Sequence, residues 1–308
     1  MASWRLARAA LEAVQFVFIC LLYAMAWILP AWFIYPATRT VGNLVFCLLP
    51  VRRRIAIENV RHALGSAAEP TRARAIARAS FGSFLLTAMP ETAKVRHRLA
   101  SPRAAAKLLR RSPDLTAMFE QARRLHERSR GCIFVTPHFG NWELLPDTAA
   151  AIGIPVAVVI RPLENRYLEH LLQRSRATTG QIFVAKRNAF LALQRFLGAG
   201  RSVALLPDQA TFKGLAVEFM GRPALTTPVP ALLAVYQQRP IVVVACFRTG
   251  ALRFSGFVSE PIWPGHYESE RAEVERLTAA MNRVMEEVVR RHPEQYLWMH
   301  NRWKAYKP

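Results

Sequence analysis

The feature that most constrains the fold is an alternation of short apolar runs and longer helical segments, which begins at Gly131 and fills the rest of the chain. The apolar runs are rich in β-branched residues, as in strands buried on both faces. Strands that alternate with helices predict crossover units, and therefore an α/β fold with a largely parallel β-sheet flanked by helices. The expected strands are 133–136, 155–160, 182–185, 202–206, 241–247 and 252–258, and the expected helices are 141–152, 164–178, 189–199, 229–239 and 268–291.

Charged side chains directly follow four successive strands of this predicted sheet. They are His138, Arg161, Lys186 and Asp208, in chain order. Ligands of parallel sheets bind beyond the carboxyl ends of the strands. We therefore expect these side chains to share one edge and to form the rim of an active site.

His138 has the position expected of a general base. Pro137 cannot continue a central strand, so His138 lies just past the strand end. Asn141 is placed to cap the next helix, which puts Glu143 in the first turn of that helix. Histidine suits proton transfer near neutral pH, and a carboxylate can orient the ring and stabilise its protonated form. The alternative is a histidine with a purely structural role at a strand end.

The N-terminal region reads as a membrane anchor that comprises residues 1–51. No charged residue occurs between Ala13 and Thr38, which predicts a membrane-spanning helix over about 14–36. The arginines that follow this stretch outnumber those before it, which favours a cytoplasmic C-terminal domain. A second apolar stretch, 41–51, is too short to span and is expected at the interface or in the return of a helical hairpin. Residues 52–130 are expected to form a helical, membrane-proximal segment, and residues 131–308 the α/β core.

The chain is strongly basic, with 42 Lys and Arg against 21 Asp and Glu and a formal net charge of +21. This charge predicts a polyanionic partner: nucleic acid, an anionic membrane, or a phosphorylated or acidic protein substrate. No recognisable nucleic-acid motif occurs, and the aromatic residues fall in apolar strands, so we expect no nucleic-acid partner. No cysteine or histidine spacing is typical of a zinc site, so we expect no metal.

The hexapeptide from His138 to Glu143 resembles the H-x4-D/E signature of the glycerolipid and lipid A acyltransferases, in the form found in the late acyltransferases of lipid A biosynthesis. Further segments resemble family motifs in the same order; they are 161–165, 205–209, 219–227 and 295–304. Met220, Pro228 and the pair Val243–Val244 depart from the family pattern. These departures affect the expected acyl groove and acceptor side rather than the reaction type.

This resemblance implies a glycerolipid acyltransferase-like fold and a membrane-bound enzyme that needs no cofactor. The enzyme would move a fatty acyl chain from acyl carrier protein to a hydroxyl of a lipid A precursor, an anionic glycolipid. His138 would be the general base and Glu143 its partner, with the backbone amides of Gly140 and Asn141 as candidate oxyanion donors. Its expected location is the bacterial inner membrane, with a single-pass anchor and a cytoplasmic catalytic domain. The candidate substrate-binding residues are Arg161, Asn165, Lys186, Asp208, Gln209 and Arg302.

Several alternatives remain open at this level. The acceptor could be another membrane glycolipid or a phospholipid, with acyl-CoA as the donor. The same histidine and carboxylate could activate water, which would make the protein a thioesterase. Arg161 could simply pair with Glu164 or Asp208, and Arg302 could be a plain surface residue. A basic membrane protein without enzymatic activity is the alternative from a different functional class.

Overall fold

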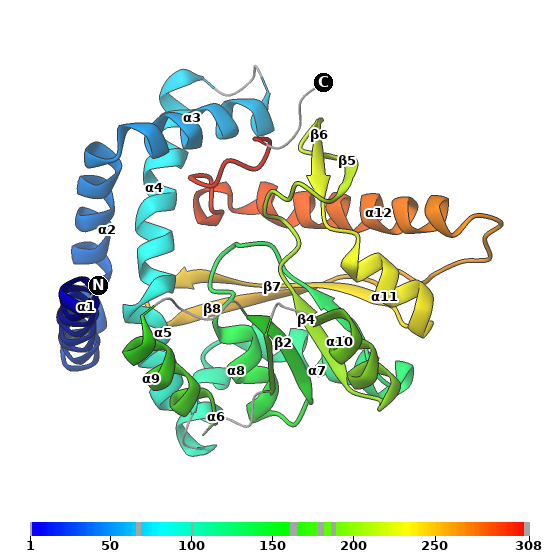
Figure 1. The fold of residues 1–308 in the computed structure, drawn as a ribbon, viewed down its shortest axis with the longest axis horizontal. Coiled ribbons are helices and arrows are strands. Elements are labelled where there is room, and N and C mark those ends of the chain that lie inside the picture. The colour runs from blue at the N-terminus through cyan, green and yellow to red at the C-terminus, as the bar shows by residue number, and fades with distance from the viewer. Residues whose placement is uncertain are drawn as a thin grey trace.

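The computed structural model describes residues 2–65, 69–99, 102–160, 165–177, 182–185 and 189–304. Helices make up the described part of the chain before residue 131, and an α/β unit follows (Figure 1). The first seven helices are α1 (Ala2–Ile28), α2 (Ala31–Leu48), α3 (Pro50–Leu64), α4 (Pro70–Ala88), α5 (Pro90–Leu99), α6 (Pro102–Arg110) and α7 (Pro113–Ser129). Helices α3 to α7 all begin at a proline, as expected, since the missing N–H costs nothing in the first helical turn.

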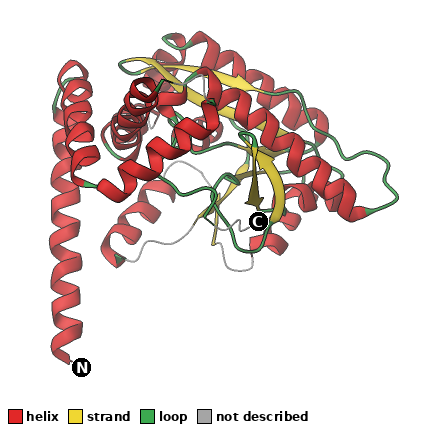
Figure 2. Ribbon diagram, turned by 90° about the horizontal axis from the view of Figure 1, so that it is seen from above, coloured by secondary structure: helices red, strands yellow, loops and turns green. Residues whose placement is uncertain are grey.

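Proline also divides the N-terminal apolar region into two helices. α1 ends at Ile28 because Pro30 has no N–H to continue it, and α2 begins at Ala31. The helix that is long and apolar enough to cross a membrane is therefore Ala9–Ile28, which starts and ends earlier than the predicted 14–36. α1 and α2 run crosswise, and the N-terminal end of α1 extends beyond the rest of the molecule (Figures 1 and 2).

The second apolar stretch, 41–51, forms the end of α2 and the start of α3. α2 packs tightly on α4, because a Cβ at Gly42 would lie only 2.5 Å from the Cα of Gly82. The opposite face of α2 leaves Val41, Leu44 and Leu48 exposed.

The predicted α/β fold is confirmed. A six-stranded sheet has the order β3-β2-β4-β1-β7-β8, and only β8, at one edge, runs antiparallel to its neighbour. The strands of this sheet are β1 (Ile133–Val135), β2 (Val156–Ile160), β3 (Ile182–Ala185), β4 (Ser202–Leu205), β7 (Ile241–Gly250) and β8 (Arg253–Val258). The helices of this unit are α8 (Leu144–Ala151), α9 (Arg166–Ala177), α10 (Ala189–Gly198), α11 (Val229–Gln237) and α12 (Glu270–Arg291).

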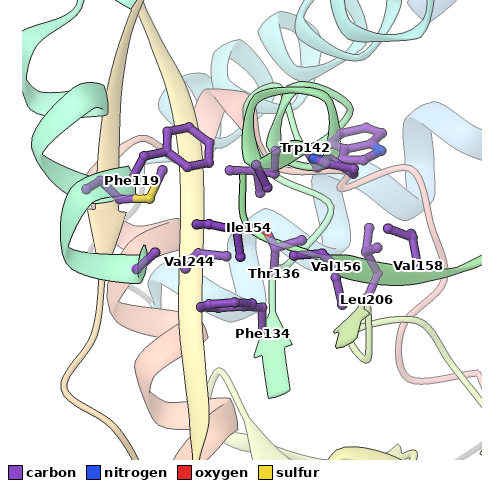
Figure 3. A pocket seen from close by; sticks show the side chains of 15 residues that line it. Phe119, Phe134, Thr136, Trp142, Ile154, Val156, Val158, Leu206 and Val244 are labelled. Atoms are coloured by element: carbon purple, nitrogen blue, oxygen red, sulfur yellow. The ribbon is translucent and has the colours of Figure 1, made fainter. Parts of the chain in front are cut away.

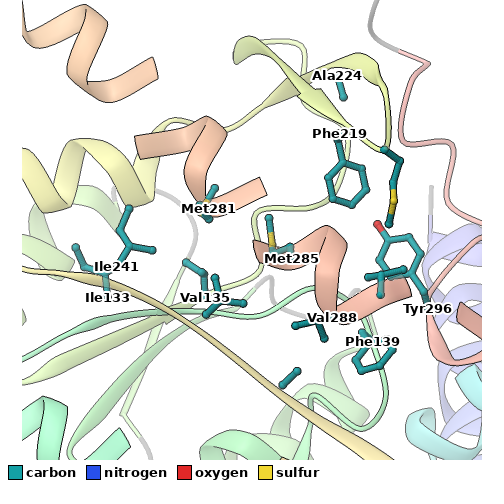
Figure 4. Packing of buried hydrophobic residues seen from close by; sticks show 14 of the residues in the cluster. Ile133, Val135, Phe139, Phe219, Ala224, Ile241, Met281, Met285, Val288 and Tyr296 are labelled. Carbon is teal, nitrogen blue, oxygen red and sulfur yellow. The ribbon is translucent and has the colours of Figure 1, made fainter. Parts of the chain in front are cut away.

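Both faces of the sheet are buried, as its β-branched strands predict. Ile133 and Val135 of β1 belong to the core shared with α10, α11 and α12 (Figure 4). Phe134, between them, points to the opposite core, which is shared with α7 and α8. This alternation follows from the two-residue period of a strand.

A separate hairpin, β5 (Leu215–Phe219) and β6 (Arg222–Thr226), was not expected from the sequence. Pro223 within β6 obscures the strand pattern. The two turn residues, Met220 and Gly221, both have positive φ values, as type I′ hairpin turns require. The hairpin contacts α12, where Asn282 Nδ2 donates to the carbonyl oxygen of Glu218 at 2.9 Å.

Candidate active site

His138 and Asp208 are brought together by the register of two neighbouring parallel strands. β1 and β4 pair with Val135 opposite Leu205. In each case a proline lies two residues after the end of the strand: Pro137 precedes His138, and Pro207 precedes Asp208. Continuing the same register places His138 opposite Asp208, at the carboxyl edge of the sheet, where the strand pattern predicts the site.

The carboxylate of Asp208 holds His138 through two hydrogen bonds. The Nδ1 of His138 lies 2.7 Å from Oδ1 of Asp208, and the backbone N–H of His138 donates to Oδ2 at 2.8 Å. Burial alone would raise the pKa of Asp208, but the hydrogen bonds and charge of His138, together with Arg302, bring the pKa below its usual range. Asp208 is therefore a carboxylate, so Nδ1 carries the proton and Nε2 is left as the proton acceptor.

His138 lines an open cleft of about 550 Å³. The exposed side chain of Gln209 lies in this cleft with its Nε2 at 3.2 Å from Nε2 of His138, consistent with an amide donor on a ring acceptor. The side chain of His138 is 16% exposed, so the base is accessible although its partner is buried. Trp142 packs edge-on against the histidine ring, with the ring centroids 5.3 Å apart.

Residues of the C-terminal motif, 295–304, lie around His138 and Asp208. Tyr296 is buried (Figure 4), and this burial, together with the nearby charge of Asp208, raises the pKa of Tyr296 well above its usual value. Burial lowers the pKa of His300, which keeps the ring neutral, and its Nε2 accepts from the backbone N–H of Ala210 at 2.9 Å. Leu297 N donates to the carbonyl oxygen of His138 at 3.0 Å. The sequence motif 295–304 was identified, but its contacts with His138 and Asp208 could only be seen in the fold.

Glu143 occupies the N-cap position of α8 rather than its first turn. The helix begins at Leu144, later than predicted, because the side chain of Asn141 does not cap it and instead donates to Glu91 at 2.6 Å. The carboxylate on Nδ1 of His138 is thus that of Asp208, in the position that we expected for Glu143.

The backbone amides of Gly140 and Asn141, the expected oxyanion donors, are already used. The N–H of Gly140 donates to the carbonyl oxygen of Gln295 at 3.0 Å, and that of Asn141 donates to the carbonyl oxygen of Cys246 at 2.8 Å. Both amides thus fix the turn to β7 and to the C-terminal segment, and their role as oxyanion donors stays a prediction. The side-chain amide of Gln209 lies within hydrogen-bond distance of Nε2 of His138.

The other expected substrate-binding residues divide into three groups. Arg161 and Lys186 lie outside the described residues. Asn165 caps α9 by accepting from the backbone N–H groups of Tyr167 and Leu168, so its position is explained by local structure. Arg302 is buried, not a surface residue, and donates to the carbonyl oxygen of Leu225 at 2.7 Å.

A second cavity, of about 50 Å³, lies on the α7 and α8 side of the sheet. Figure 3 shows apolar side chains turned into it, including those of Phe119, Phe134 and Ile154. Trp142 and Leu206 line it as well, and they link it to the catalytic edge: Trp142 contacts the ring of His138, and Leu206 also lines the open cleft. An apolar cavity beside the histidine suits an apolar part of a ligand, and at this volume it holds only a small one.

The structure thus places a histidine against a buried carboxylate, at the carboxyl edge of the parallel sheet of an α/β protein and beside an apolar cavity. The profile of the bacterial lipid A biosynthesis acyltransferases matches residues 5–305, and the chain belongs to this family.

Two curated proteins are similar to this chain. One is the lipid A biosynthesis palmitoleoyltransferase of Escherichia coli (strain K12), and the other is a lipid A biosynthesis acyltransferase of Shigella flexneri. Each is 25% identical to this chain over 194 residues, which is 60% of this chain and 60% of the relative. The match thus spans less than two thirds of either curated protein.

Proposed function

We propose that this protein is a membrane-bound acyltransferase that moves a fatty acyl chain from an acyl thioester, carried by acyl carrier protein, to a hydroxyl of a lipid A precursor. The observation that carries the proposal is the pair formed by His138 and Asp208 at the mouth of the open cleft, in a chain that belongs to this acyltransferase family. The names of the two relatives support the transfer of an acyl group and a lipid A-type acceptor.

The reaction begins with proton transfer to His138. The acceptor hydroxyl replaces the amide of Gln209 at Nε2 and gives up its proton there while its oxygen attacks the thioester carbonyl. Asp208 keeps the Nδ1 proton in place and stabilises the imidazolium that forms. Collapse of the tetrahedral intermediate breaks the carbon–sulfur bond, and the departing thiolate takes the proton back from Nε2. The products are an ester on the lipid and a free thiol on the carrier.

The charge that develops on the carbonyl oxygen needs a donor close to the base. We assign this role to the side-chain amide of Gln209, because it lies at 3.2 Å from Nε2 of His138 and its exposed side chain can turn toward the substrate. The predicted role of Glu143 as the partner of His138 stays a prediction, with Glu143 at the N-cap of α8.

The acyl chain would enter the apolar cavity behind Trp142, which has to widen from its volume of about 50 Å³ to hold a long chain. A hydrocarbon tail loses water-exposed surface there, which favours binding by about 25 cal/mol for each Å² buried. The wall of the cavity contains small side chains, Ala122 and Ala149, whose size would limit the length of chain accepted.

Membrane attachment and charge are consistent with lipid and carrier substrates. α1 is long and apolar enough to cross a bilayer, and it would hold the catalytic domain at the cytoplasmic surface of the bacterial inner membrane. The net charge of +21 would attract an anionic glycolipid and an acidic carrier protein.

The test is transfer of a labelled acyl chain from acyl carrier protein to a tetra-acylated lipid A precursor by the purified full-length protein. His138→Ala should abolish transfer, whereas His266→Ala, at an exposed histidine outside the site, should retain it. Activity only with acyl-CoA or with another membrane lipid would keep the reaction and replace the donor or acceptor. Hydrolysis at the rate of transfer would indicate a thioesterase, and inactivity with every hydroxylated lipid would overturn the proposal.

A further inference from the structure

A buried ion pair lies directly behind the turn 139–141, which follows His138. Glu91 of α5 is fully buried, and the side chain of Arg248, at the end of β7, is 9% exposed. The Nε of Arg248 lies 2.6 Å from Oε2 of Glu91. These residues are far apart in the sequence, and the proposed reaction assigns neither of them a role.

The guanidinium of Arg248 holds the turn from one side. Its Nη2 donates to the carbonyl oxygen of Gly140 at 3.4 Å and to the hydroxyl of Thr87. The Thr87 hydroxyl in turn donates to the same carbonyl oxygen at 2.6 Å. Nη1 donates to Ser83 Oγ at 2.8 Å, so all three guanidinium nitrogens of Arg248 make hydrogen bonds. The carbonyl oxygen of Gly140 is therefore fixed between α4 and β7.

The carboxylate of Glu91 holds the turn from the other side. Its Oε2 accepts from Nδ2 of Asn141 at 2.6 Å. Its Oε1 accepts from the hydroxyl of Tyr35, which lies in α2 and itself accepts from the backbone N–H of Leu252 at 2.8 Å. The network thus connects the turn to the helix that follows the apolar α1.

The turn has almost no freedom to move within this frame. Gly140 has a φ of +60°, and a Cβ there would lie 2.0 Å from the carbonyl oxygen of Cys246. The side chain of Gln295 hydrogen-bonds both the N–H and the carbonyl oxygen of Arg248. The backbone carbonyl oxygen of Gln295 accepts from the N–H of Gly140. A displacement of Arg248 would therefore move the turn and, with it, His138.

Buried ion pairs add little net stability in many proteins, because desolvation offsets much of the attraction between the charges. Here each partner also hydrogen-bonds the turn directly, Arg248 at the carbonyl oxygen of Gly140 and Glu91 at the side chain of Asn141. We propose that Arg248 and Glu91 are positioning residues that hold the turn 139–141, and hence His138, in the geometry required for acyl transfer. This inference rests on the proposed function for its kinetic consequences, but not for the structural restraint itself.

Two substitutions at Arg248 separate positioning from stability. Arg248→Lys keeps a positive charge opposite Glu91 but cannot donate to Ser83, Thr87 and Gly140 at the same time. We expect its melting temperature to stay close to that of the wild type while kcat falls at least about tenfold. Arg248→Met removes both the charge and the guanidinium hydrogen-bond donors. Its kcat should fall by about 10²-fold, the loss typical of a displacement of about 1 Å. KM for both substrates should change by less than about threefold, since the cleft is unaltered.

Two variants of α12 serve as controls. Arg276→Met breaks another arginine–glutamate pair, with Glu273, that has an N–O distance of 2.7 Å. Leu277→Ala lowers stability through the fully buried core. Both should keep the wild-type kcat, even where the melting temperature matches that of Arg248→Met.

Hydrogen exchange of the full-length proteins provides a measurement that does not depend on activity. Amides in the segment 138–142 should exchange faster in Arg248→Lys and in Glu91→Gln than in the wild type, and should be unchanged in Leu277→Ala. Wild-type kcat together with wild-type exchange in Arg248→Lys would overturn the inference, as would equal loss of kcat in Leu277→Ala. If the wild type transfers no acyl group, the proposed function fails, and exchange of this segment alone decides whether the pair restrains the turn.

Discussion

Substitution of Asp208 by asparagine is the sharpest test of the histidine–carboxylate pair. The two side chains have nearly the same shape, so Asp208→Asn should disturb packing little. The amide carries no charge and presents an NH2 group as well as an oxygen. With the NH2 group toward Nδ1 it would favour the tautomer in which Nε2 is protonated, and a protonated Nε2 cannot accept a proton from the acceptor hydroxyl.

The size of the effect follows from the distance between the charges. Nδ1 and Oδ1 are 2.7 Å apart, which places the centres of the imidazolium and carboxylate charges about 4 Å apart. At an effective dielectric constant of about 20 their attraction is about 4 kcal/mol. Because each 1.36 kcal/mol in the barrier changes the rate about tenfold, we expect kcat to fall by about 10³-fold.

The assay compares single-turnover acyl transfer by the wild type, Asp208→Asn and Glu143→Gln, with melting temperatures measured in parallel. We expect Asp208→Asn to lose activity while its melting temperature shows that it is folded. Glu143→Gln should lose less, because Asp208 already holds Nδ1. A folded Asp208→Asn protein with more than about a tenth of the wild-type kcat would refute the reasoning, since it leaves less than about 1.4 kcal/mol for the charge.

Three further predictions follow from the same structure. Gln209→Leu removes the amide beside Nε2 of His138 and should lower kcat by about 10²-fold or more with little change in melting temperature; an unchanged kcat would exclude Gln209 as the oxyanion donor. Ala149→Phe blocks the apolar cavity and should shift the preference toward shorter acyl thioesters, measured by competition between donors of different length; an unchanged preference would move the acyl chain to another site. Burial lowers the pKa of His300 below its unfolded value of about 6.5, so the unfolded state binds the proton more readily, and stability should fall as the pH drops from about 7 through that range. His300→Gln should lose part of that pH dependence in melting experiments, and a pH dependence equal to that of the wild type would argue against it.

The layered architecture was predictable because it depends on local patterns. Short β-branched runs between amphipathic segments indicate a parallel sheet wherever they occur, and the prolines at the starts of α3 to α7 mark helix boundaries directly. Local pattern was less reliable where one residue serves a distant partner. Asn141 reads as a helix cap, but its side chain is taken by Glu91, and α8 begins at Leu144 instead.

The sequence by itself determined that His138 and Asp208 both lie just past strand ends, since each follows an apolar run and a proline. Only the tertiary structure decided that they meet. β4 lies beside β1 in the strand order, and their register places the carboxylate against Nδ1 across 70 residues of chain. The same holds for Glu91 and Arg248, whose contact depends on how α5 packs against the end of β7. Periodicity reports which face of an element is buried, whereas the partner of a buried charge depends on strand order and helix packing, which no local pattern encodes.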